Sequence, residues 1–68
     1  MSEKETQSGI HVKLTGKDGN IFNLMGIVLR ALRRNGRSDL CEPFKQAITS
    51  SHSYQEALAR IMEFVIVE

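Results

Sequence analysis

One long amphipathic helix is the strongest signal in this sequence. Between Ile21 and Arg34 the apolar residues recur at three- and four-residue spacing, the period of a helix with one buried face. That face consists of Ile21, Leu24, Met25, Val28 and Leu32, and it is widened by Phe22, Leu29 and Ala31. Asp18 or Asn20 can cap the start, and Asn35-Gly36 predicts a left-handed stop. Other segments must therefore cover one side of this helix.

Strand signals stand near both ends of the chain. Ile10, Val12 and Leu14 alternate with polar residues, which predicts a half-buried strand that ends in the turn at residues 16–20. The β-branched and aromatic run at residues 64–67 also favours a strand. No turn residue separates this run from the helical pattern before it, so the boundary can fall anywhere from residue 62 to 65.

Two more helices are predicted between these strands. The first runs from Ser38 or Asp39 to about Thr49, and its start has two alternatives: a capping box of Asp39 with Glu42, or a later start at Glu42 before Pro43. Its apolar stripe is Leu40, Phe44, Ala47 and Ile48, with Cys41 beside it. The second begins at residue 53, where Ser53 and Glu56 form a capping box, and its stripe is Tyr54, Ala57, Leu58, Ile61, Met62 and Val65.

The predicted fold is a small α+β domain with the element order β-α-α-α-β. Residues 1–8 are polar and predict a flexible tail, and residues 9–68 form the single domain. The terminal strands pair in a short sheet whose one face the helices cover, with the pairing direction left open. Because a two-stranded sheet is marginal and its edges invite pairing, we expect a homodimer.

Size and composition limit the classes of function. In a chain of 68 residues with no disulfide, a single core rarely supplies more than about 3–5 kcal/mol, which also favours self-association. The net charge of +1 provides no long-range field for nucleic acid. The single Cys41 fits a reducing compartment, and neither a bilayer-length apolar run nor a signal-peptide core is present, so we expect a cytoplasmic protein without a membrane partner.

No residue pattern predicts a catalytic, metal or cofactor site. His11, Cys41 and His52 stand far apart and lack zinc-site spacing. The glycines of the turn at residues 16–20 do not complete a phosphate-binding fingerprint. Asp18, Asp39, Glu42 and Glu56 all have capping explanations instead of acid–base roles. We therefore expect a protein that is not an enzyme and holds no cofactor.

A cluster of arginines is the one concentration of charge, made of Arg30, Arg33, Arg34 and Arg37. Cations at the end of a helix complement its dipole, and this is the simplest interpretation. The alternatives are contact with an acidic protein partner or with nucleic-acid phosphates. The nucleic-acid hypothesis is the weaker one. The predicted second helix offers few basic side chains that could contact DNA, and no set of aromatic side chains that could stack on single-stranded bases is evident.

Ile27 is a large apolar residue at the edge of the polar side of the first helix, and it is the candidate self-association residue. Met25 and Met62 also suit a protein contact, although burial between neighbouring elements is the preferred interpretation for both. The overall prediction is a non-enzymatic accessory or binding protein that self-associates through strand edges or an apolar helix surface. The alternative is a small nucleic-acid-binding protein that uses the arginine cluster.

The stretch Val12–Phe22, with its Leu-Thr-Gly-Lys-Asp-Gly-Asn turn, followed by Ala-Leu-Arg-Arg-Asn-Gly at residues 31–36, resembles a group of small uncharacterised bacterial and phage proteins. The resemblance covers residues 10–37 well and the rest loosely. It implies a shared fold and an accessory gene of a mobile element as the origin. No function carries over from it.

Overall fold

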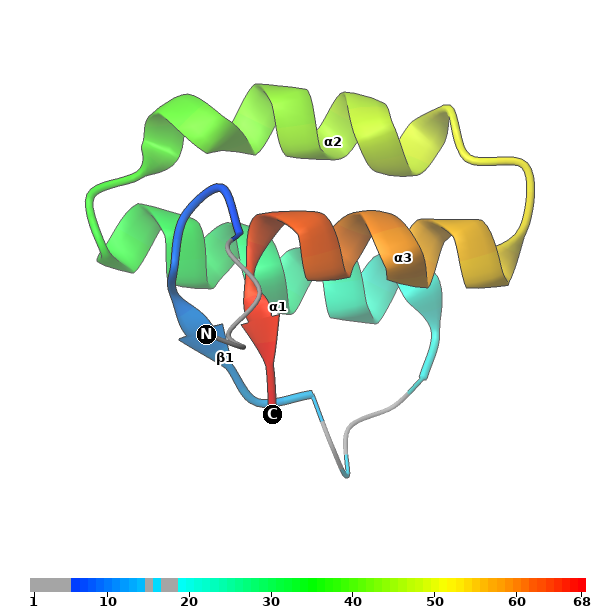
Figure 1. The fold of residues 1–68 in the computed structure, drawn as a ribbon, viewed down its shortest axis with the longest axis horizontal. Coiled ribbons are helices and arrows are strands. Elements are labelled where there is room, and N and C mark those ends of the chain that lie inside the picture. The colour runs from blue at the N-terminus through cyan, green and yellow to red at the C-terminus, as the bar shows by residue number, and fades with distance from the viewer. Residues whose placement is uncertain (1–5, 15, 17–18) are drawn as a thin grey trace.

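The computed structural model describes residues 6–14, 16 and 19–68. It confirms the predicted order of elements in a small α+β domain (Figure 1). The elements are β1 (His11–Val12), α1 (Ile21–Arg34), the short 3-10 helix η1 (Ser38–Leu40), α2 (Cys41–Thr49), α3 (Tyr54–Phe64) and β2 (Ile66–Val67). Among these helices of the described chain, none is both long enough and apolar enough to cross a bilayer.

Both ends of α1 follow local sequence chemistry. Asn20 caps its start, where the side-chain oxygen accepts a hydrogen bond from the backbone N–H of Phe22 at 2.8 Å. The competing cap, Asp18, lies outside the described residues. At the other end Gly36 has a φ of 74°, and the backbone N–H of Arg37 donates to the carbonyl of Leu32 at 2.8 Å. These features form a Schellman stop, as the Asn-Gly pair predicts.

The start of α2 differs from both predicted alternatives. The 3-10 helix η1 leads directly into α2, and no side chain caps either one. Asp39 does not cap the helix; its carboxylate pairs with Arg37 instead. Pro43 lies in the first turn of α2, where its missing N–H costs no intrahelical hydrogen bond.

The capping box of α3 is present with a shift of one residue. The hydroxyl of Ser53 accepts from the backbone N–H of Glu56 at 3.1 Å, as predicted. The Glu56 carboxylate in turn accepts from the N–H of His52 at 3.0 Å, one residue before the cap. At its other end α3 runs into β2 without a turn, and the boundary lies at Phe64.

The core lies between the three helices and the inner face of the sheet. Its buried members are Val12, Leu24, Val28, Leu32, Leu40, Cys41, Phe44, Ile48, Ala57, Ile61, Phe64 and Val65. Phe44 and Phe64 meet edge to face with ring centroids 5.3 Å apart. Phe22 does not join this core and is 71% exposed, because it lies on the flank of α1 and not on the stripe of Leu24 and Val28.

The two strands pair in parallel, which the sequence left open. His11 lies opposite Ile66 and Val12 lies opposite Val67. The N–H of Ile66 donates to the carbonyl of Ile10 at 2.8 Å, and the N–H of Leu14 donates to the carbonyl of Glu68 at 3.1 Å. Both strands are shorter than their sequence patterns predict. The sheet is therefore short, and it lies beneath the helices (Figure 1).

Residues 6–8 belong to the folded domain, although the sequence predicts a flexible tail over residues 1–8. The N–H groups of Gln7 and Ser8 donate to the carbonyls of Glu63 and Phe64, both at 3.0 Å. The Ser8 hydroxyl adds a 2.6 Å hydrogen bond to the Phe64 carbonyl and accepts from the N–H of Ile10. The segment thus satisfies carbonyls that the last turn of α3 leaves without helical partners.

Replacing a glycine by alanine should have opposite effects inside α1 and at the stop just after it. We expect Gly36→Ala to lower the free energy of unfolding by about 1–2 kcal/mol, because an L side chain is strained at this positive φ. Gly26→Ala is the matched control: no atom lies within 4 Å of the new Cβ, so we expect a gain of about 0.5–1 kcal/mol. Urea unfolding of both variants measures the difference, and equal effects would contradict it.

Ser8→Ala should destabilise the fold by about 1 kcal/mol, because it leaves the Phe64 carbonyl and the Ile10 N–H without the hydroxyl partner. Gln7→Ala keeps the backbone hydrogen bond and should cost little. Chemical denaturation of the two variants provides the measurement. If Ser8→Ala were as stable as the parent protein, the Ser8 hydroxyl would not stabilise the end of α3 as described.

Candidate functional site

Large hydrophobic side chains, most of them exposed, gather on one side of α3. Tyr54, Leu58 and Met62 follow one another at one residue per helical turn, with Tyr54 48% and Met62 52% exposed. Val67 of β2 (39% exposed) flanks this row, as does Phe22 of α1. We call these five residues the apolar face. The sequence favours burial for Met62, and the structure shows this to be wrong: on α3 the buried positions are Ala57, Ile61 and Phe64.

Tyr54 links the apolar face to the loop before α1. It is the first residue of α3, directly after the Ser53 cap, and its hydroxyl donates a hydrogen bond to the Gly19 carbonyl. A Cβ at Gly19 would lie 3.3 Å from that hydroxyl oxygen, so the loop and the ring approach closely. This contact holds the tyrosine ring at the surface between two hollows.

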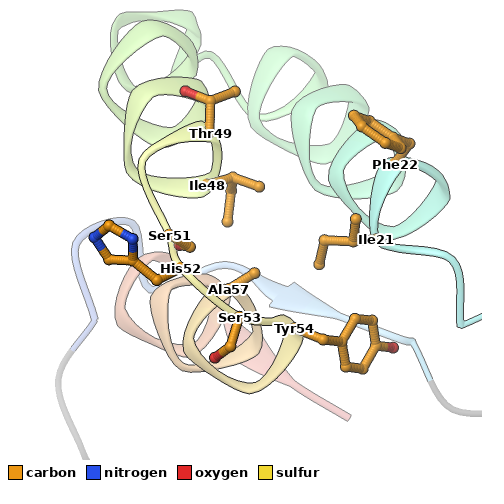
Figure 2. A pocket seen from close by; sticks show the side chains of 9 residues that line it. All are labelled: Ile21, Phe22, Ile48, Thr49, Ser51, His52, Ser53, Tyr54 and Ala57. Carbon is orange, nitrogen blue, oxygen red and sulfur yellow. The ribbon is translucent and has the colours of Figure 1, made fainter.

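The first hollow opens between the start of α1 and the turn from α2 to α3 (Figure 2). It has a volume of about 440 Å³, with Ile21, Ile48 and Ala57 at its base and the rings of Phe22 and Tyr54 beside it. The second hollow, of about 310 Å³, lies on the other side of Tyr54 and is lined mainly by aliphatic side chains. They include Leu14, Leu24, Leu58, Met62 and Val67. Both hollows can accept apolar side chains of a partner.

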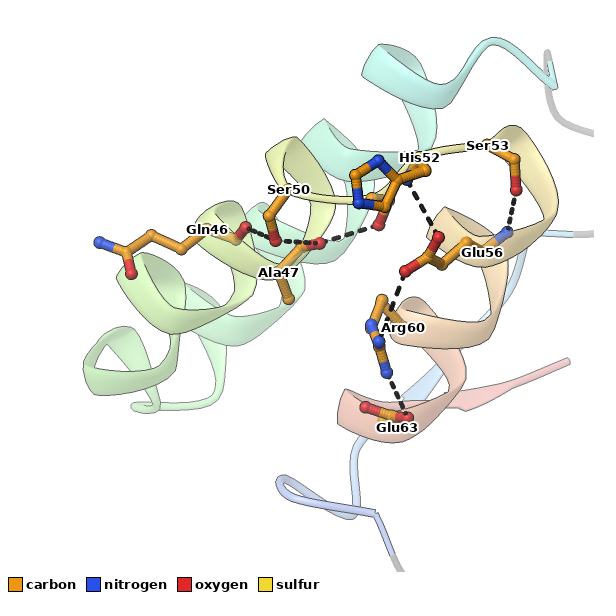
Figure 3. A network of polar contacts seen from close by, with 9 residues as sticks. Gln46, Ala47, Ser50, His52, Ser53, Glu56, Arg60 and Glu63 are labelled. Atoms are coloured by element: carbon orange, nitrogen blue, oxygen red, sulfur yellow. Dashed lines mark hydrogen bonds and ion pairs between the residues drawn. The ribbon is translucent and has the colours of Figure 1, made fainter.

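The opposite flank of α3 is polar, and its charged side chains pair with one another (Figure 3). Arg60 bridges Glu56 at 3.5 Å and Glu63 at 3.0 Å. The hydroxyl of Ser50 donates to the Gln46 carbonyl at 2.7 Å, which closes the end of α2. These contacts stabilise α3 and the end of α2, and they therefore have a structural explanation.

The structure divides the arginine cluster predicted from the sequence. Arg37 pairs with Asp39 through its Nε at 3.2 Å, and this hydrogen bond is the main cause that lowers the pKa of Asp39 below its ordinary value. Arg30 and Arg34 lie one turn apart on α1 and face β1, where they line a groove with Lys13. Arg33 is exposed and lies about 100° around the helix from Arg34.

Ile27 lies in that same groove, and not on the apolar face. It is half-buried and packs against the core beside β1, which explains an apolar residue at this edge of α1. Its predicted role in self-association stays a prediction. Met25, two residues earlier on α1, is half-buried against the core, in keeping with the interpretation favoured for it.

The soft metal ligands of the sequence do not converge. Cys41 is buried, and its Sγ lies 3.9 Å from the Leu29 carbonyl. His11 is exposed and contacts the Glu68 carboxylate, whereas His52 is exposed in the turn before α3. Within residues 6–14, 16 and 19–68, no group of three or more His, Cys, Asp or Glu side chains could hold a metal ion.

Sequence reasoning did not place three residues of these surfaces: Phe22, Tyr54 and Lys13. Phe22 and Tyr54 were assigned to buried stripes, although each lies at the flank of its helix, and a helical projection alone could have placed them there. Lys13 was recognised on the polar side of a strand, but no sequence signal shows that this strand lies beside Arg30 and Arg34.

Comparison with known proteins identifies no relative: no protein-family model, no curated protein and no solved structure matches this chain. The candidate sites therefore rest on their geometry.

Arg37→Met should raise the pKa of Asp39 toward its ordinary value, because the variant removes the guanidinium hydrogen bond that lowers it. A lowered folded-state pKa stabilises the fold above the ordinary carboxyl pKa, and this contribution is lost as the pH falls through the lowered value. The stability difference between parent and variant should therefore shrink in acid. NMR titration of the Asp39 side chain measures the pKa, and Arg33→Met, which lacks this contact, should leave it unchanged.

Proposed function

We propose that this chain is a non-enzymatic binding protein that self-associates through the apolar face and the adjacent outer edge of β2. The observation that carries the proposal is the exposure of four large hydrophobic side chains around two neighbouring hollows: Phe22 and Tyr54 line the first, and Tyr54, Met62 and Val67 line the second. Contiguous apolar surface of this kind marks protein contact sites in soluble domains.

The occupant we favour is a second copy of the chain. The backbone N–H groups of Ile66 and Glu68 point to β1. The N–H of Val67, which lies between them, therefore points to the outer edge of β2. Two copies related by a two-fold axis can pair these edges in antiparallel fashion and extend the two-stranded sheet to four strands. The same axis brings the two apolar faces together.

Charge and size support the same occupant. Arg30 and Arg34 of α1 lie beside β1, at the other edge of the sheet, so two copies can approach through β2 without opposing these cations. A chain of 68 residues also has a small core, and burial of the apolar face against a second copy would add to its stability.

Sedimentation equilibrium over a concentration series, at low and high salt, tests this function. We expect a dimer whose dissociation constant changes little with salt, because the contact is apolar. Met62→Lys or Val67→Lys should each weaken the dimer by about thirtyfold or more, the effect of losing about 2 kcal/mol at a central contact.

Gln46→Lys is the matched control, because it adds the same charge to an exposed position of α2 away from the apolar face. It should leave the dimer intact. A protein that stays monomeric at every concentration would contradict the proposal. So would a dimer that Gln46→Lys and Met62→Lys weaken equally.

A further inference from the structure

The small net charge conceals an uneven distribution of charge over the surface. The described residues contain five carboxylate side chains, and each contacts a cationic or histidine side chain at 2.5–3.5 Å. These carboxylates neutralise Arg37, Lys45 and Arg60. In the described part of the chain, the cations without such a contact are Lys13, Arg30, Arg33 and Arg34.

Three of these four cations surround one groove. It lies between β1 and the C-terminal half of α1 and has a volume of about 280 Å³. Its apolar residues are Val12, Ile27 and Ala31, and its cations are Lys13, Arg30 and Arg34. All three cations are exposed, so an anion can reach them from solvent.

Backbone donors add to the side chains along this groove. The N–H of Leu14 donates to β2, and the carbonyls of Ile10 and Val12 accept from it. Because ladder contacts alternate along a strand, the N–H groups of His11 and Lys13 point to the outer edge of β1. This edge borders the groove, since both residues line it.

The helix dipole does not explain this arrangement. It accounts for cations in the last turn of α1, such as Arg34, but its effect falls off within that turn. Arg30 lies one turn earlier, and Lys13 belongs to a different element. Like charges around one groove repel each other, and a bound anion would remove this repulsion.

Among the described residues, one histidine and one carboxylate lie beside the groove, and they contact each other. His11 also lines the groove, and its Nδ1 contacts the Glu68 carboxylate at the end of β2. In the described chain, Glu68 is the carboxylate that contacts a groove residue, and it already pairs with that imidazole. Protonation of His11 would add a further positive charge beside Lys13.

We infer that the groove between β1 and α1 binds the phosphate group of a ligand. Two arginines one turn apart can form paired hydrogen bonds with phosphate oxygens, and a lysine with edge N–H groups completes the set of donors. The same chemistry is shared by small phosphate esters and by the nucleic-acid backbone. This site does not depend on the proposed dimer, because it lies at the other edge of the sheet.

Two probes test the inference. In NMR titrations with inorganic phosphate, the backbone amides of His11, Lys13 and Ala31 should shift in the parent protein and not in the double variant Arg30→Gln/Arg34→Gln. Fluorescence anisotropy with a short mixed-sequence DNA duplex distinguishes the two sources of phosphate. Three phosphate contacts predict affinity for the duplex that falls about fortyfold from about 50 to about 200 mM salt, and the double variant should fall only about threefold to fourfold.

Lys45→Gln/Arg60→Gln is the matched control, because it removes the same net charge from cations that are already paired. It should bind as the parent protein does. Groove amides that shift with phosphate while the duplex fails to bind would support the site and assign it to a small phosphate ester. The inference would be overturned if the NMR signals of the groove amides did not shift on addition of phosphate. Equal loss in both double variants, or equal affinity for a polyglutamate peptide, would overturn it too.

Discussion

The pairing of the two ends of the chain holds this fold together. Residues 7–14 lie along residues 63–68 through backbone hydrogen bonds that both complete the sheet and satisfy the last carbonyls of α3. Val12 and Val65, from these two segments, are buried in the core that the helices share. Without this pairing, α3 would lack its C-terminal partners and β1 would have no place beside α1.

Both candidate surfaces are consequences of that sheet. The outer edge of β2 continues into the apolar face, and the outer edge of β1 borders the cationic groove. Because a two-stranded sheet has two edges, the two surfaces lie apart and differ in chemistry. In a dimer built through β2, the two grooves would stay open on the outside of the assembly. Self-association and phosphate binding are therefore compatible.

The charge of the molecule shows why composition is a poor guide to its partners. A net charge of +1 argues against an anionic ligand when it is treated as uniform. The carboxylates of α2 and α3 are, however, used in local pairs, such as those of Glu56 and Glu63 with Arg60. Those pairs leave Arg30, Arg34 and Lys13 to set the local potential of the groove.

The sequence by itself determined the elements whose causes are local. The bounds of α1 and its Gly36 stop follow from side-chain acceptors and glycine conformation within a few residues, as does the Ser53 cap of α3, whereas the sequence left the cap of α1 open between Asp18 and Asn20. Tertiary structure decided the parallel pairing, the exposure of Met62, and the meeting of Lys13 with Arg30 and Arg34. These features depend on how elements distant in the chain share a small core. A helical or alternating period in the sequence shows only which face of an element is apolar. It does not show which neighbouring element covers that face.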